Sequence, residues 1–310
     1  VAFVSGTVVQ YIARLIFTFN FEKVYRRVGG VYAGFCLTAI FYFLVMKGAK
    51  GASFMQPEWI QFMDENTWPI VTSLFFALSV VFQILIVAMN VNIFKVVILA
   101  GTFSLAFAFA GNDLVNFVGV PLAAWDSYKE WSAAAIAPEL FTMEGLLKPT
   151  VAATGFLLFA GLVMVLTLWF SKKAQIVIQT SINLSSSNSG EQEQFGSSLP
   201  GRMIVRASMG LGRVINQIIP MSVQKGIDRR FEPRKMHQGE TPLPFDYVRA
   251  SINLVVSAIL IASATSLKLP LSTTYVTFMV AMGSSFADGA WDRETAVYRI
   301  SGVLTVISGW

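Results

Sequence analysis

The residues best suited to chemistry form a short polar run within an apolar stretch of the sequence. This run contains Asn112, Asp113 and Asn116. Between Lys95 and Asp126, Asp113 is the only charged residue. A carboxylate at the centre of a membrane helix costs about 2.5–3.5 kcal/mol on insertion scales, so such residues usually serve a function. Helical spacing would place the three side chains on one face. Their oxygens suit a hard monovalent cation, or Asp113 carries a proton.

Small and helix-breaking residues surround this run. The Ala110–Gly111 step precedes it, and Gly119 and Pro121 follow it. Such residues allow a helix to break or another backbone to approach closely. The alternative interpretation is that these polar groups only hydrogen-bond neighbouring helices within the membrane.

A second polar run lies much later in the chain, where Ser272, Thr273 and Thr274 follow Pro270. Proline suits the first turn of a helix, so we expect the hydroxyls to lie in that turn, near unpaired backbone N–H groups. A helix N-terminus inside a membrane binds anions, and adjacent hydroxyls add neutral donors. The alternative is an N-capping run on an ordinary membrane span.

The two runs together predict coupled binding of a cation and an oxyanion. Neither 96–125 nor 269–287 contains Arg or Lys, so a bound anion would face no fixed positive side chain. Asp113 would repel that anion unless a cation or a proton neutralised it first. The cation would therefore prepare the site, and hydroxyls and helix dipoles would then hold the oxyanion weakly enough to release it.

In this order, the motifs at 112–124 and 269–274 resemble those of the PiT family of inorganic phosphate transporters. That family has two inverted copies of one unit. Each copy carries a Gly-x-Asn-Asp motif on a broken helix and a Pro-x-Ser-Thr-Thr motif on a helical hairpin. The sequence departs from the family where Val120 separates Gly119 from Pro121, and where Tyr275 replaces the histidine of many members.

The resemblance implies roles for six residues. Phosphate contacts are implied for Asn112, Ser272, Thr273 and Thr274. Cation contacts, with Na⁺ as the metal if the protein is sodium-coupled, are implied for Asp113 and Asn116. The coupling ion is expected to be Na⁺ or H⁺, with no other cofactor.

The expected function is symport of inorganic phosphate with Na⁺ or H⁺ by alternating access, without enzymatic activity. One alternative is transport of sulfate or another oxyanion by the same fold. Another is a channel or scaffold membrane protein that uses Asp113 only for helix packing. We expect a homodimer in contact with membrane lipid, in a bacterial inner (plasma) membrane, with no nucleic-acid partner.

The composition indicates an all-α polytopic membrane protein. Hydrophobic residues make up 55% of the 310 and charged residues 13%, against roughly 25% charged residues in soluble domains. The only cysteine, Cys36, lies in an apolar run, and the only histidine, His237, lies in a polar loop. A disulfide or a cysteine-rich metal site is therefore excluded. No Gly-x4-Gly-Lys-Ser/Thr loop occurs, which argues against nucleotide hydrolysis by that route.

Apolar runs of about 20 residues predict the membrane spans. Two segments are unusual: 96–125 is too long for one straight crossing, and 269–287 opens at a proline and carries hydroxyls. We expect a broken helix in the first and a re-entrant hairpin in the second. The remaining predicted spans are Val1–Phe17, Val28–Met46, Pro69–Met89, Thr150–Phe170, Ala250–Leu267 and Ala296–Trp310.

Loop charges predict the orientation. Segments 14–27 and 171–249 are basic, whereas 47–68 and 126–148 are acidic. If the basic segments are cytoplasmic and 96–125 crosses once, every loop agrees with the positive-inside rule.

Four regions follow from this topology. Residues 1–95 would close a first repeat and lead onward, 96–170 would begin a second repeat, and 250–310 would hold the hairpin and last helices. The chain reads as an internal segment of a longer protein. Between these parts lies a cytoplasmic polar insert, 171–249.

The insert is expected to be mixed in order. Its 185–198 portion has a flexible-linker composition. Residues 202–219 have amphipathic periodicity, which fits either a helix on the inner leaflet or one that packs on its own protein. A cytoplasmic regulatory partner is a further prediction for this insert.

Overall fold

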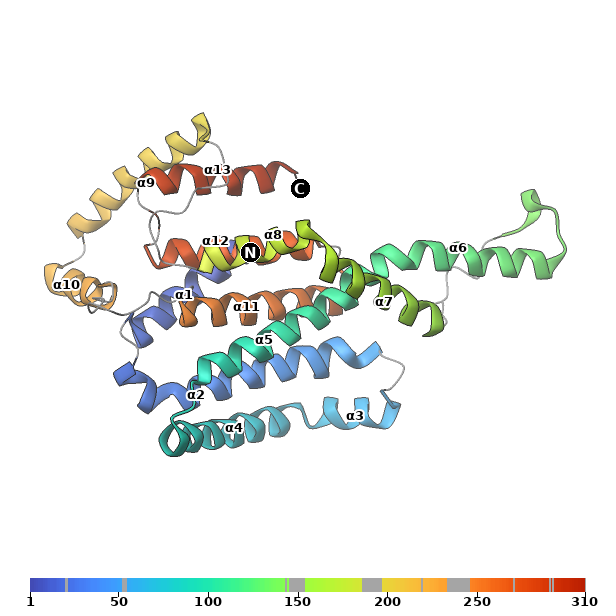
Figure 1. The fold of residues 1–310 in the computed structure, drawn as a ribbon, viewed down its shortest axis with the longest axis horizontal. Coiled ribbons are helices and arrows are strands. Elements are labelled where there is room, and N and C mark those ends of the chain that lie inside the picture. Colours follow the sequence, from blue (N-terminus) through green and yellow to red (C-terminus); the bar gives the residue numbers. More distant parts are fainter. Residues whose placement is uncertain are drawn as a thin grey trace.

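The computed structural model describes residues 1–19, 22–51, 55–142, 144, 154–185, 197–218, 220–232, 246–269, 271–289, 291 and 293–309. Within these ranges the regular secondary structure is helical, which confirms the all-α class (Figure 1). The α-helices are α1 (Ala2–Phe17), α2 (Glu22–Phe41), α3 (Pro57–Glu65), α4 (Thr67–Met89), α5 (Ile93–Phe109), α6 (Val115–Ala134), α7 (Thr154–Phe170), α8 (Lys172–Ser185), α9 (Leu199–Ile218), α10 (Met221–Arg230), α11 (Tyr247–Ser266), α12 (Thr273–Ala287) and α13 (Arg293–Gly309).

Four helices in the described part are long and apolar enough to cross a membrane. A fifth candidate is the bent pair of α7 and the first part of α8. The protein is therefore an all-helical polytopic membrane protein. The four long helices are Val24–Gly48, Thr67–Met89, Ile93–Ala134 and Tyr247–Ser266.

Helix α11 lies at the centre of the bundle, between α5 on one side and α1 and α12 on the other (Figure 1). Its apolar residues Val248 and Ile252 are buried in the main hydrophobic core. Phe17 of α1 and Phe94 of α5 join the same core, with ring centroids 5.5 Å apart in an edge-on arrangement. Of the four long apolar helices in the described part, α11 therefore has the largest buried share.

Helices α11 and α12 pack against each other and are joined by a short connection, so together they form a helical hairpin. It differs from the re-entrant hairpin expected within 269–287, because that segment contributes the single helix α12, and α11 is itself long and apolar enough to cross a membrane. Ser272 caps the N-terminus of α12 by accepting a hydrogen bond from the backbone N–H of Tyr275 at 3.4 Å. Thr273 and Thr274 therefore lie in the first turn, as expected, whereas Ser272 lies just before it. Pro270 lies outside the described residues.

Glycines allow two close helix contacts. At Gly6 and Gly283, α1 and α12 approach so closely that an added Cβ would meet the backbone of the other helix. Between α2 and α4, Gly30 and Gly34 form a Gly-x-x-x-Gly pair, and a Cβ on Gly30 would lie 2.7 Å from the Ser79 carbonyl oxygen. Small residues bring helices together in membranes because lipid offers no hydrophobic drive for their association.

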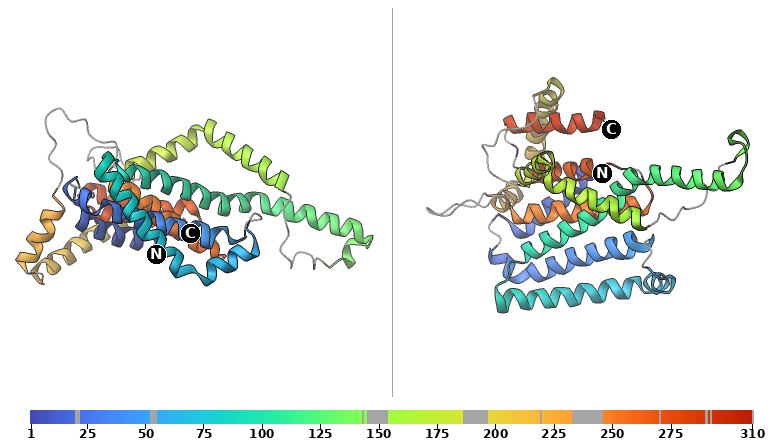
Figure 2. Two further views of the ribbon diagram at one scale, coloured as in Figure 1. Left: turned by 90° about the horizontal axis from the view of Figure 1, so that it is seen from below. Right: turned by 45° about the vertical axis from the view of Figure 1, so that its right-hand side comes forward.

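The predicted break in 96–125 takes the form of a π-helical segment, η3 (Ala110–Leu114), which joins α5 to α6. The two helices run on through it as one span of 42 residues, with Pro121 inside α6. Helix α6 extends beyond the rest of the molecule (Figure 2). The backbone irregularity therefore falls at the predicted residues, but it changes the helix type and does not end the helix.

Parts of the predicted polar insert are ordered against the bundle. Helix α7 meets the first part of α8 at an angle of 71°, and α8 packs on α11 and α12. Helix α9 packs on α13, where Ser198 and Ser301 share a 2.7 Å hydrogen bond and Val205 is buried. This contact fits the interpretation in which the amphipathic helix packs on its own chain. Residues 186–196 and 233–245, with His237, lie outside the described residues.

Candidate functional site at the two ends of helix α12

The two predicted motifs, 160 residues apart, meet at the N-terminal end of α12. The hydroxyl of Thr273 donates a 2.7 Å hydrogen bond to one carboxylate oxygen of Asp113. The side-chain amide of Asn112 donates to the other oxygen at 3.0 Å and to the Leu271 carbonyl at 3.3 Å. The π-helical segment thus holds the carboxylate against the start of the hairpin's second helix.

Not every predicted site residue belongs to this contact. Thr273 is buried and Ser272 half-buried, but Thr274 is exposed in the first turn of α12. Asn116 is exposed in the first turn of α6, whereas Asn112 and Asp113, in the π-helical segment before it, are half-buried. The expectation that Asn116 shares a cation with Asp113 therefore stays a prediction.

The charge environment at this end of α12 is simple. In the described part of the chain Asp113 forms no ion pair, and its hydrogen-bond donors there, Thr273 and Asn112, are neutral. A carboxylate keeps lone pairs free after two hydrogen bonds and accepts either a proton or a hard cation. The start of α12 adds backbone N–H groups that suit an oxyanion. Within the described residues no cluster of three or more His, Cys, Asp or Glu side chains is placed to hold a metal ion.

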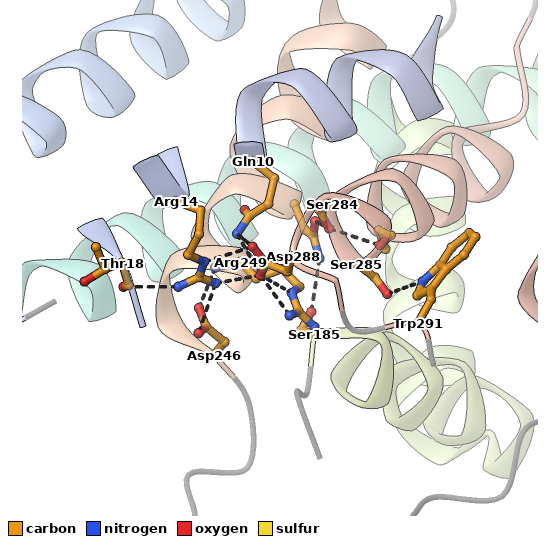
Figure 3. A network of polar contacts seen from close by, with 12 residues as sticks. Gln10, Arg14, Thr18, Ser185, Asp246, Arg249, Ser284, Ser285, Asp288 and Trp291 are labelled. Atoms are coloured by element: carbon orange, nitrogen blue, oxygen red, sulfur yellow. Dashed lines mark hydrogen bonds and ion pairs between the residues drawn. The ribbon is translucent and has the colours of Figure 1, made fainter. Parts of the chain in front are cut away.

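The opposite end of α12 holds a buried charge cluster around Asp288 (Figure 3). Arg14 donates from Nε and Nη2 to the two carboxylate oxygens of Asp288 at 2.8 and 2.6 Å. Arg249 donates from Nε to Oδ2 at 2.8 Å, and Gln10 donates to both oxygens at 2.9 Å. Gln10 and both arginines are 0% exposed and Asp288 6%.

A second carboxylate balances the charge of this cluster. Asp246 caps the N-terminus of α11, where it accepts the backbone N–H of Arg249 at 2.9 Å. It also lies 3.1 Å from Nη2 of Arg14. Burial alone would raise the pKa of Asp288, but hydrogen bonds and charges from Arg14 and Arg249, with the Gln10 hydrogen bond, hold that pKa below its usual range. Two guanidinium groups and two carboxylates thus join α1, α11 and α12.

Sequence reasoning missed this cluster because it counted Arg14 and Arg249 as loop charges. In the structure Arg14 lies in the last turn of α1 and Arg249 in the first turn of α11. The segments 14–27 and 171–249 remain basic without them, so the predicted orientation is unchanged. The usable signal was Gln10 and Arg14, two polar residues four apart in an otherwise apolar helix.

A pocket of about 190 Å³ lies between the two ends, bounded by α5, α8, α11 and α12. Its polar lining comes from Thr277, Asn253, Ser257 and Ser185. Asn253 donates to the Ser185 hydroxyl at 3.2 Å and accepts from the Ser284 hydroxyl at 2.5 Å. The pocket is therefore a neutral polar space beside the middle of α12.

No protein-family model, curated protein or solved structure matches this chain. The fold and these two polar groups define a helical membrane protein with an uncompensated carboxylate at a hairpin tip and a compensated charge cluster at the hairpin's other end.

Proposed function

We propose that this protein is a secondary transporter that couples movement of Na⁺ or H⁺ to uptake of inorganic phosphate. The observation that carries the proposal is the contact between Asp113 and Thr273 at the N-terminus of α12. It joins a carboxylate that forms no ion pair with any described residue to a helix start that suits an oxyanion. The order of the motifs, which resembles that of PiT phosphate transporters, supports the choice of substrate.

The coupling follows from electrostatics. With Asp113 ionised, the helix start already faces a negative charge, and phosphate would be repelled. A proton or a Na⁺ on Asp113 removes this repulsion and frees the Thr273 hydroxyl and the α12 backbone N–H groups for phosphate. Asn112, which bridges Asp113 and the Leu271 carbonyl, ties the occupancy of the carboxylate to the position of the hairpin tip.

Sulfate is the main alternative substrate because it shares the tetrahedral shape and the negative charge of phosphate. A channel or scaffold role, with Asp113 used only for helix packing, is the alternative from a different class. The Asp113–Thr273 bond does fit a packing role, so the decisive difference is dependence on a cation gradient.

The test is radiolabelled phosphate uptake into vesicles that carry the full-length protein. Uptake is measured with a sodium gradient, with a pH gradient and with neither, for the wild type and for Asp113→Asn. Asp126→Asn is the matched control, because Asp126 lies on the same long helix and pairs with Lys129 at 3.6 Å, outside the site.

We expect gradient-driven uptake that Asp113→Asn abolishes and Asp126→Asn leaves intact. Dependence on the sodium or the pH gradient identifies the coupling ion. Competition by excess sulfate separates the two oxyanions. Absence of phosphate uptake under both gradients, with the protein folded and inserted, would contradict the phosphate proposal, and normal uptake by Asp113→Asn would favour the packing role.

A further inference from the structure

The charge cluster at the C-terminal end of α12 has the geometry of an oxyanion site. Arg14 donates two N–H groups to the two oxygens of Asp288, and the guanidinium group of Arg249 donates to the same carboxylate (Figure 3). Bidentate guanidinium contacts are the usual way in which proteins recognise carboxylate and phosphate. The carboxylate of Asp288 stands where an oxygen-bearing anion would bind.

The charges of Asp288 and Arg249 are opposite in sign to those that the dipoles of their own helices favour. Asp288 caps the C-terminus of α12, where the dipole favours a cation, and Arg249 lies in the first turn of α11, where it favours an anion. Each charge is therefore held by its partner and not by its own helix. An anion that replaced Asp288 would sit near the N-terminus of α11 as well as near both guanidinium groups.

One face of α12 connects this cluster to the Asp113 end. Thr273, Thr277, Ser284 and Asp288 recur at helical spacing along that face, over about 22 Å at 1.5 Å per residue. Thr277 lines the neutral pocket, and the pocket residue Asn253 bonds to Ser284, one turn before Asp288. Polar groups thus follow the helix from the hairpin tip to the two arginines.

We propose that Arg14 and Arg249 form a second oxyanion site, which the carboxylate of Asp288 occupies while this end of the hairpin is closed. When the hairpin moves and withdraws Asp288, the incoming anion takes its place between the guanidinium groups. The identification of that anion as phosphate rests on the proposed function. The existence of an oxyanion site is argued from the geometry of the two arginines and does not depend on that function.

Gln10 indicates a preference among oxyanions. Its side-chain NH2 group donates to both oxygens of Asp288, but its buried Oε1 has no hydrogen-bond partner among the described residues. An ionised carboxylate has no proton to offer this oxygen. Phosphate at neutral pH carries at least one O–H and would donate it to Oε1, whereas sulfate carries none. The site is therefore expected to bind phosphate more tightly than sulfate.

The first test uses Asp288→Asn, which leaves the arginines in place and removes the competing charge. The substitution is made in the full chain together with Thr273→Ala, so that the Asp113 end does not contribute. Inorganic phosphate should raise the thermal unfolding midpoint by a few degrees more than chloride at equal ionic strength, and sulfate should raise it less.

Two comparisons make this result specific. Adding Arg14→Gln should remove the phosphate effect. Asp246→Asn, which neutralises the partly exposed carboxylate and leaves Asp288 in place, should show no such effect. An unfolding midpoint that phosphate and chloride shift equally in Asp288→Asn would overturn the proposal. Because no transport is measured, this outcome is independent of whether the wild type takes up phosphate.

A second test uses the wild type, in case Asp288→Asn does not fold. Phenylglyoxal, an arginine-specific reagent, is applied to vesicles that carry the protein, with and without inorganic phosphate, and labelling of Arg14 and Arg249 is followed by mass spectrometry. We expect labelling of both arginines that phosphate suppresses, with the exposed Arg202 labelled equally under all conditions. No labelling in the absence of phosphate, or labelling that phosphate does not change, would contradict an anion site.

Discussion

The two ends of α12 hold carboxylates in opposite environments. At the N-terminal end Asp113 is half-buried, and its hydrogen-bond donors in the described part of the chain are neutral. At the C-terminal end Asp288 is buried and accepts from two guanidinium groups and an amide. The first carboxylate is free to take up a cation or a proton, whereas the second is already neutralised by the protein.

This difference separates a carboxylate that is open to a cation from one that the protein's own guanidinium groups neutralise while this end of the hairpin is closed. Breaking a buried ion pair by removing one partner is costly because a charge is left uncompensated in a poor solvent. Removing the charge of a half-buried carboxylate with neutral partners should cost the protein little stability. The two ends should therefore differ in how much stability a substitution costs, and the following predictions run from the largest to the smallest effect on stability.

The largest loss of stability is expected for Asp288→Leu. It leaves Arg14 and Arg249 buried and removes the carboxylate that both of them contact. Loss of one member of a buried ionic group costs about 3–5 kcal/mol. Reversible unfolding in detergent, followed by circular dichroism, measures this loss.

Asp126→Leu is the matched control, since its pair with Lys129 is exposed and is worth about 0–1 kcal/mol. The pH dependence provides an independent check. The folded state holds the pKa of Asp288 below its ordinary value of 3.8, so its contribution is complete above pH 3.8 and is lost as the pH falls through the folded-state pKa. Equal stability of Asp288→Leu and Asp126→Leu would contradict the expected contribution of the buried charge cluster.

A smaller loss is expected for Gly283→Ala, near the charge cluster. The added Cβ would meet the Phe3 carbonyl of α1 and lie 2.9 Å from the Thr7 hydroxyl. Overpacking of this kind costs about 1–3 kcal/mol. Gly226→Ala in α10 has open space around the added Cβ and is expected to be neutral or stabilising. If the two variants unfold at the same denaturant concentration, the α1–α12 contact is looser than the structure indicates.

At the N-terminal end of α12, Thr273→Val should cost about 1–1.5 kcal/mol, the value of one hydrogen bond lost at a buried hydroxyl. It should also slow phosphate uptake, because the hydroxyl contacts the carboxylate that is expected to load the cation. Thr274→Val serves as the control for stability, since Thr274 is exposed. A Thr273→Val protein with unchanged uptake would remove the hydroxyl from the transport site.

The smallest effect on stability is expected for Asp113→Asn, at about 0.5 kcal/mol, because the amide can keep one of the two hydrogen bonds. The same variant should lose gradient-driven uptake. Parallel measurement of unfolding and uptake in one preparation checks both. A large loss of stability would show that Asp113 is a structural residue like Asp288, and the contrast between the two ends would disappear.

Much of the fold was predictable because long apolar runs in the sequence identify membrane helices. The runs 28–46 and 69–89 lie within long described helices. The start of α12 was predictable from the prolyl and hydroxyl residues at 270–274, since these residue types suit the first turn of a helix. The irregularity near Gly111 was predictable in place but not in form, because a glycine permits a break, a bend or a π-helix equally.

Contacts between residues that lie far apart in the sequence were much less predictable. The hydroxyl run and Asp113 were each recognised as unusual, and a shared site was expected from their chemistry and from the resemblance to a transporter family, but not which atoms are in contact. The exposure of Asn116 was not foreseen, because burial depends on how the helices pack. Arg249 was assigned to a loop because a charged residue at the start of an apolar run is typical of a loop.

By itself the sequence determined which segments are helices in an apolar solvent and which polar residues lie within them, since backbone satisfaction and hydrophobicity act locally along the chain. Only the tertiary structure decided how the charges are compensated. Arg14, Arg249 and Asp288 belong to three helices, and whether each charge is neutralised depends on how those helices pack (Figure 3). Charge compensation over a few ångströms is a property of packing, and linear spacing does not contain it.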